Sequence, residues 1–269
     1  MNRWLAGLCL AAALCPAHAE ERPLWELGAG VGLLQLPHYR GSDQSHTWLL
    51  PVPYVSYRGE ILKADREGAR AVLYESSRVD FDLSLGASAP TRSDDNVARR
   101  GMADLPPTFE LGPNINFTLA RDVDWKLDLR APVRTAITLQ SHPRSIGWLS
   151  TPNLNLDLID VGGWHVGLQA ALVFGDRRYH AHFYDVAPQD VLPDRPAYQS
   201  RGGFGGGHLL ASTSRRIGQF WVGAFGRLDS VRGAVFDDSP LVRQRNQWSL
   251  GMVVSWVFAA STKTVTSAE

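Results

Sequence analysis

The sequence has little cysteine: Cys9 and Cys15 are the only two among 269 residues. Both lie in the opening segment MNRWLAGLCLAAALCPAHAEE, which combines a basic residue, a short apolar stretch and an A-x-A motif. This pattern is typical of a secretory signal peptide, and we expect cleavage between Ala19 and Glu20. Because the chain after residue 19 contains no cysteine, a secreted disulfide scaffold is excluded.

Long hydrophobic runs and net charge are also missing. No segment approaches the roughly 18 consecutive apolar residues that a membrane-spanning helix needs. Lys and Arg together number 27, and Asp and Glu together also number 27. A balanced charge supplies no basic surface of the kind that binds nucleic acid, so we expect no nucleic-acid partner.

Helical periodicity is scarce, and period-two alternation takes its place. In 79–87 and in 123–134, apolar residues occupy every second position and mostly polar residues lie between them. The segment WELGAGVGLL at 25–34 alternates glycine with larger residues, so its glycines share one face of a strand. Its G-x-G-x-G spacing is not the dinucleotide fingerprint G-x-G-x-x-G, and Pro37 follows where a helix would be needed.

Twelve segments are predicted as strands, with ten as the fallback because Pro51 and Pro53 interrupt the second. Short turns join alternate pairs, while the intervening connections are mostly long. That asymmetry is typical of an outer-membrane β-barrel with periplasmic turns and extracellular loops. The predicted strands are 24–35, 47–57, 60–64, 68–75, 79–87, 108–120, 123–138, 147–159, 164–175, 205–215, 219–231 and 247–258.

The end of the predicted barrel supports the same fold class, an all-β antiparallel transmembrane barrel over residues 20–258. The segment SLGMVVSWVF at 249–258 resembles the C-terminal strand signal that the outer-membrane barrel-assembly machinery recognises, carried here by Gly251, Val254, Trp256 and Phe258. A polar tail, 259–269, follows, and we expect it to be disordered in the periplasm.

Three segments, together with this strand end, carry a family resemblance. They are LPHYRGSD at 36–43, LPVPYVSYRGEILKADREGARAVL at 50–73 and SDDNVARRGMADLPPTFELGP at 93–113. With SWVF they make residues 24–258 similar to the MipA/OmpV family of outer-membrane proteins.

The resemblance implies a bacterial outer-membrane location, with lipids and lipopolysaccharide around the barrel. It also implies a scaffold that brings a lytic murein transglycosylase together with a bifunctional peptidoglycan synthase. The resemblance supplies no catalytic residues. We therefore expect no enzyme activity, no cofactor and no metal. The alternative function is a small-solute channel or a surface-exposed binding or stress-response protein.

Charged residues at the predicted inward positions offer two interpretations. They can form a polar channel, or they can pair across strands and close a narrow lumen, which we favour because buried charges need partners. The predicted lumen charges are Asp80, Asp82, Glu110, Asp124, Lys126, Asp128, Arg130, Arg134, Asp157, Arg227 and Asp229.

Three weaker candidates come from the loops and from histidines. The SDDN segment at 93–96 clusters carboxylates but lacks the spacing of a calcium loop. His180 and His182 share a side of YHAHFYD if that stretch is extended, but no third metal ligand is evident. A membrane hydrolase needs a serine and a histidine together, and His165 lies on the predicted polar face.

Overall fold

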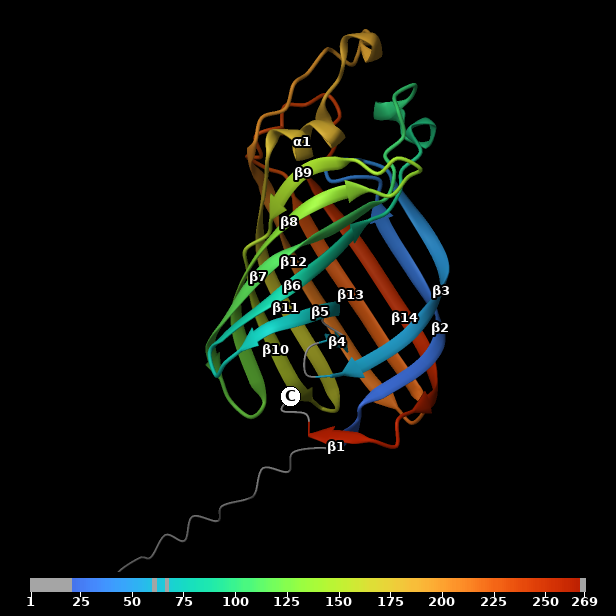
Figure 1. The fold of residues 1–269 in the computed structure, drawn as a ribbon. Coiled ribbons are helices and arrows are strands. Elements are labelled where there is room, and N and C mark those ends of the chain that lie inside the picture. Colours follow the sequence, from blue (N-terminus) through green and yellow to red (C-terminus); the bar gives the residue numbers. More distant parts are fainter. Residues whose placement is uncertain (1–20, 60–61, 66–67, 267–269) are drawn as a thin grey trace, which may run out of the picture.

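The computed structural model describes residues 21–59, 62–65 and 68–266; the expected signal peptide and its cleavage point, Ala19 to Glu20, lie outside them. One antiparallel sheet curves into a barrel wall whose strand order returns to its start (Figure 1). Its strands are β2 (Trp25–Pro37), β3 (Ser45–Arg58), β4 (Leu62–Asp65), β5 (Gly68–Glu75), β6 (Val79–Ser88), β7 (Thr108–Arg121), β8 (Trp125–Thr138), β9 (Ser145–Ser150), β10 (Asn153–Val161), β11 (Trp164–Gly175), β12 (Gly203–Ile217), β13 (Phe220–Ser230) and β14 (Asn246–Ala260).

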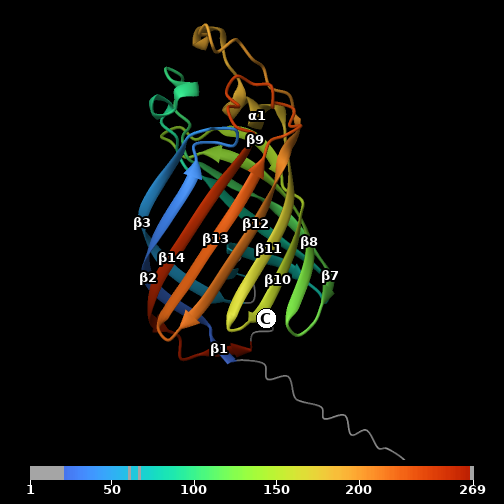
Figure 2. The ribbon, with the colours of Figure 1, turned by 180° about the vertical axis from the view of Figure 1, so that it is seen from behind.

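The wall closes because β14 pairs with β2, while β9 and β10 both lie between β8 and β11. Strands β9 and β10 form one crossing, interrupted at Thr151 and Pro152. Counted this way, the described part of the wall has the predicted twelve strands and not the fallback of ten. The continuous back of the wall, from β10 to β14, is seen in Figure 2.

The two faces of the wall differ in polarity. Along β14, Met252, Trp256 and Phe258 are exposed on the outside, whereas Ser249 and Ser255 are buried inside. Apolar residues outside and polar residues inside are the pattern of a barrel in lipid. This confirms the predicted fold class, which alternation alone could not separate from a soluble sandwich.

The glycine stripe of β2 faces the lumen. A Cβ atom at Gly30 would overlap the Val254 carbonyl oxygen and the Ser255 side chain of β14, and one at Gly32 would lie 2.9 Å from a Val52 methyl group of β3. The stripe therefore allows close approach of neighbouring inward side chains. It is a packing feature of the wall.

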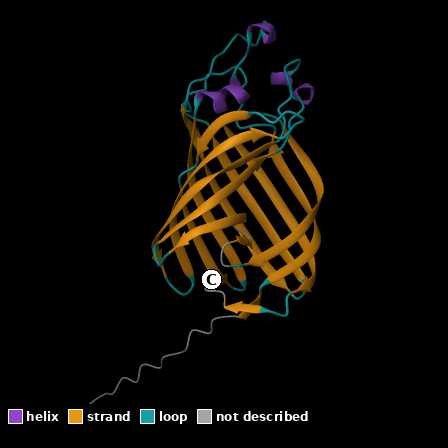
Figure 3. Cartoon of the chain, viewed as in Figure 1, coloured by secondary structure: helices purple, strands orange, loops and turns teal. Residues whose placement is uncertain are grey.

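Both rims match the predicted asymmetry. Short turns join strands at one rim, here called the turn rim, and the long connections gather at the other, the loop rim (Figure 3). The loop rim holds helix α1 (Arg177–Tyr184) and the single turns η1 (Ser93–Asp95), η2 (Val97–Arg99) and η3 (Pro188–Asp190). No helix in the described part of the chain is long and apolar enough to cross a membrane.

The prediction of a disordered tail from residue 259 onward is wrong for the part that the structure describes. Strand β14 continues to Ala260, and β15 (Thr264–Thr266) pairs antiparallel with β1 (Glu21–Pro23) at the turn rim. The backbone amide of Leu24 also donates to the Lys263 carbonyl at 2.8 Å. Alternating Thr and Val at 264–266 suits a strand, and the other chain end supplies its partner.

Candidate functional site

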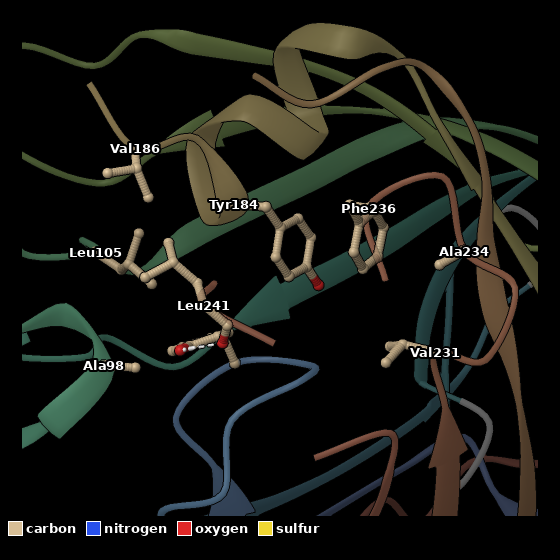
Figure 4. Close-up of a cluster of buried hydrophobic side chains, with 9 residues drawn as sticks. Ala98, Leu105, Tyr184, Val186, Val231, Ala234, Phe236 and Leu241 are labelled. Carbon is tan, nitrogen blue, oxygen red and sulfur yellow. Dashed lines mark hydrogen bonds between the residues drawn. The ribbon is translucent and has the colours of Figure 1, made fainter. Parts of the chain in front are cut away.

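The long loops pack together and cover one end of the barrel. Their buried side chains form an apolar cluster, here called the plug, shown in Figure 4: Tyr39, Ala98, Leu105, Tyr184, Val186, Val231, Ala234, Phe236 and Leu241. The Tyr184 and Phe236 rings stack with centroids 3.7 Å apart. The Tyr39 hydroxyl donates to the Leu241 carbonyl at 2.7 Å, which joins loops about 200 positions apart. The plug therefore unites four separate connections.

Buried arginines tie the loops together at the plug. The Arg99 guanidinium donates to the carbonyls of Phe183 at 3.0 Å and Ala103 at 3.1 Å, and it lies 5.8 Å from the Tyr39 ring centroid. Arg195 donates to the Ala98 carbonyl at 3.0 Å. Both guanidinium groups thus donate hydrogen bonds to carbonyl oxygens of the loops, as buried polar groups require.

A cavity of about 390 Å³ lies beneath the plug, within the size range of small-molecule sites. Tyr184 and Phe236 contribute to its lining from the loops. The wall contributes residues from β2, β3, β6, β7, β8, β9, β10, β11, β12, β13 and β14.

Two ion-pair groups line the polar part of this cavity. Asp229 accepts from Arg40 at 2.9 Å and from Arg227 at 2.6 Å. Across the cavity lining, Arg134 lies 3.4 Å from the Glu110 carboxylate. Three guanidinium groups therefore face two carboxylates, which leaves the lining with an excess of positive charge.

Histidine and amide side chains complete the polar lining. The Nδ1 of His180 is 2.8 Å from the Arg201 carbonyl, so it carries the proton and leaves Nε2 as an acceptor. That buried Nε2 has no hydrogen-bond partner among the described residues. His208 Nε2 lies 3.2 Å from Gln169 Oε1, and Gln169 in turn donates to Asn153 at 3.1 Å.

The remaining predicted lumen charges form a second network nearer the turn rim. Buried Asp128 is 3.1 Å from Lys126 and 3.4 Å from Arg130, and Arg130 also lies 3.6 Å from Asp157. Asp82 accepts from the amides of Asn114 and Asn116. Asp80 lies on the same face of β6 as Asp82, opposite Asn116.

Asp124 differs from the other predicted lumen charges. It lies exposed in the turn before β8, which begins at Trp125 and not at residue 123. The prediction that Asp124 faces the lumen is therefore wrong, because this residue belongs to the turn between β7 and β8 and not to a strand. Arg40 was not predicted as a lumen charge because it belongs to a loop. Only the inward fold of that loop brings its side chain to Asp229.

The stretch YHAHFYD is not extended, so the condition under which His180 and His182 would share a side is not met. Residues 177–184 form α1, whose N-cap Asp176 accepts from the Tyr179 backbone amide at 2.8 Å. In the SDDN segment, Asn96 is buried against His38 and Ser42, whereas Asp94 and Asp95 are exposed. Within the described residues no three metal-ligating side chains come together.

The predicted assembly signal lies in β14. Val254, Trp256 and Phe258 are exposed on the outer face, and the Trp256 and Phe258 rings pack edge to face with centroids 5.6 Å apart. Gly251 turns inward against the Phe225 ring, where a Cβ atom would overlap it.

Comparison with solved structures finds membrane barrels at low similarity. The outer membrane phospholipase A from Escherichia coli is 12% identical, with a TM-score of 0.32, and the match covers 87% of this chain and 93% of that one. The beta domain of the Bordetella autotransporter BrkA is 15% identical, with a TM-score of 0.36 and coverage of 87% and 100%. A Pseudomonas aeruginosa FadL homologue is 10% identical, with a TM-score of 0.34 and coverage of 91% and 74%.

Curated proteins include no match to this sequence. A family model described as "MltA-interacting protein MipA" matches residues 28–258, which is nearly the whole barrel. The match and the barrel together place the protein in the bacterial outer membrane. This chain belongs to the MipA family.

Proposed function

We propose that this barrel is a non-enzymatic docking protein of the outer membrane that holds a lytic murein transglycosylase, and through it a peptidoglycan synthase, at the periplasmic rim. The description of the family names MltA as the interacting protein. The family resemblance found in the sequence implies that this partner is a lytic transglycosylase.

The observation that carries the proposal is the ribbon formed by β1 and β15 at the turn rim. Glu21, Arg22 and Pro23 lie opposite Thr266, Val265 and Thr264. Within the described residues, each of these two strands pairs only with the other. Their outer edges are therefore available to a partner strand, a recognised mode of protein–protein recognition.

The ribbon is held firmly to the wall. Arg58 donates to the Pro23 carbonyl at 2.9 Å and to Glu26 at 3.1 Å, and Glu26 also lies 3.2 Å from Arg216. A fixed ribbon loses little conformational freedom when it binds, which favours affinity. It also adds periplasmic surface to a rim whose turns are otherwise short.

Truncation after Ser261 tests this proposal, because it removes β15 but keeps the β14 assembly signal. The variant and the wild type are crosslinked in cells, purified and analysed by mass spectrometry. We expect recovery of the transglycosylase and the synthase to fall about tenfold on truncation. Replacement of the exposed loop 189–194 with a Gly-Ser linker is the matched control and should leave recovery unchanged.

Two results would contradict the proposal. One is recovery of both enzymes that the truncation leaves unaltered. The other is recovery of only barrel-assembly factors and lipopolysaccharide components with the wild type, which favours the channel or surface-binding alternative. Heat-modifiable migration on gels checks that each variant forms a folded barrel.

A further inference from the structure

The strand ladder of the barrel is broken on one side. Strand β3 pairs with β2 along Ser45 to Tyr57, but in the described part of the chain it pairs with β4 only at Tyr57 and Arg58. On the facing side, the pairing of β6 with β5 ends at Ser84. Among the described residues, no strand therefore joins residues 45–56 of β3 to residues 85–88 of β6. We call this interval the wall break; it lies in the loop-rim half of the wall (Figure 1).

The sequence of β3 suits a permanent free edge. The backbone amide of Arg58 donates to the Leu24 carbonyl, so even-numbered residues of β3 direct their amides toward β2. Pro51 and Pro53 have the opposite parity and present their nitrogens to the wall break. Proline has no N–H, so these two positions present no donor to lipid, whereas Thr47, Leu49 and Val55, which share their parity, still direct their amides to the wall break. The two prolines, which made this strand hard to predict, are typical of an edge strand.

Loop contacts frame the top of the wall break. The Thr91 hydroxyl donates to the His38 carbonyl at 2.6 Å, and the Val97 amide donates to Gln44 at 2.6 Å. These contacts join the connection after β6 to the connection before β3. The two edges are thus held together above the break without strand pairing between them.

The lumen face beside the wall break is apolar, unlike the rest of the lumen. Trp48, Leu50 and Val52 of β3 have the inward parity, opposite Leu34, Gly32 and Gly30 of β2. Leu50 is 41% exposed although it has this parity. The Val52 methyl group packs closely over Gly32, so the apolar side chains of β3 lie near the β2 backbone.

The cavity beneath the plug extends to both edges of the wall break. Trp48 lines it from β3, and Gly86, Ala87 and Ser88 line it from β6. Its other end carries the ion-pair groups of Asp229 and Glu110 described above. One cavity therefore reaches residues at both edges of the wall break and also a polar lining with excess positive charge.

We propose that the cavity binds a single-chain anionic amphiphile that enters from the outer leaflet through the wall break. The acyl chain lies along the apolar stripe of Trp48, Leu50 and Val52. The anionic head lies near Arg40, Arg134 and Arg227, where guanidinium donors suit carboxylate or phosphate oxygens. The plug closes the cavity on the outer side, so the membrane supplies the ligand.

A photoreactive probe tests this site directly. The full-length mature barrel in lipid vesicles is exposed to a diazirine analogue of dodecanoate, irradiated, digested and mapped by mass spectrometry. We expect crosslinks on the inward residues Trp48, Leu50 and Val52 of β3 and on 86–89. Labels confined to outward residues such as Leu49 and Val55 would show ordinary lipid contact and would overturn the proposal.

A matched pair of glycine variants adds a second measurement. A Cβ atom at Gly86 would lie 2.6 Å from the Glu110 carboxylate and 3.2 Å from the Arg134 guanidinium, so Gly86→Val disturbs this ion pair at the edge of the wall break. Gly226 lies on the intact wall, where the nearest atom, from Leu250, would be 3.5 Å away. We expect Gly86→Val to reduce crosslinking about tenfold and Gly226→Val to leave it unchanged. Equal labelling of both variants, each folded by gel migration, would contradict the proposal.

Chain length distinguishes a lipid from a free small anion. Unlabelled dodecanoate should compete with the probe, whereas butanoate at the same concentration should not, because it has too little apolar surface to bury. Equal competition by butanoate would mean that the head group alone binds, and the membrane route would then be wrong.

Discussion

Asp128 illustrates how the lumen charges stabilise the wall. Its side chain is buried, and it contacts Lys126, Arg130 and the Thr118 hydroxyl. Removing one partner from a buried charge network leaves the others uncompensated, at a cost of about 3 kcal/mol. We expect Asp128→Ala to lower the free energy of unfolding by about that amount, measured by urea titration in detergent micelles.

Asp124 provides the control for this prediction, since it lies four positions away in an exposed turn. Asp124→Ala should change the free energy of unfolding by less than about 0.5 kcal/mol. Similar losses of unfolding free energy in Asp124→Ala and Asp128→Ala would show that burial in the lumen does not determine the cost of losing the carboxylate.

The titration of His182 should make the stability of the packed loops depend on pH. Burial, assisted by the nearby charges of Arg99 and Arg144, lowers the pKa of its imidazole to about 4 from an ordinary value of 6.5. The folded loops therefore favour the neutral form. This contribution to stability is fully present above pH 6.5 and is lost as the pH falls toward 4.

Trypsin cleavage in the loops should accordingly accelerate as the pH falls below about 6.5. His182→Gln cannot take up the proton and should show a weaker pH dependence, after correction for the intrinsic pH profile of the protease on an unfolded substrate. An identical pH dependence in wild type and variant would contradict this role of His182.

Individual lumen residues were predictable to the extent that a strand positioned them. Alternation in β7, β8 and β13 identified Glu110, Asp128 and Asp229, because side chains on a strand change face at every residue. Alternation does not reach past a strand end, which is why Asp124 was misplaced. No local pattern indicates that Arg40 folds back from a loop into the lumen.

Among the elements, the plug is the part whose stability can be tested apart from the wall. Phe236 is fully buried and stacks on Tyr184. Phe236→Ala should destabilise the packed loops by about 3 kcal/mol and expose them to protease, while the strands stay protected. Limited trypsin digestion followed by mass spectrometry measures both effects.

The exposed loop residue Val191 is the comparison for Phe236. Val191→Ala should leave the digestion pattern of the wild type unchanged. Cleavage within the strands of Phe236→Ala would mean that the plug and the wall unfold together, contrary to this account.

Strands were predicted more closely than the other elements. The twelve predicted segments correspond to the observed crossings because a barrel in lipid imposes alternation at every strand. Helix α1 was missed although Asp176 is a suitable N-cap, since eight residues in a loop give too short a pattern. Strand β15 depends on a partner at the opposite end of the chain, which local sequence does not reveal.

At the level of the whole molecule, the barrel is closed at the loop rim and filled with paired charges farther down. The plug unites four connections, and Asp128 and Asp229 each contact two cations within the lumen. This arrangement fits the proposed docking function at the rim and predicts that the barrel does not pass solutes through its lumen.

Single-channel conductance in planar bilayers tests that claim most directly. We expect the wild-type barrel to show no stable conductance steps, because the plug packs across the loop rim and the lumen charges pair with one another. A variant with 176–202 replaced by a short Gly-Ser linker removes part of the plug and serves as the comparison. A silent wild type with stable steps in the variant would show that the plug closes the barrel. Stable steps from the folded wild type would contradict the docking proposal and favour the channel.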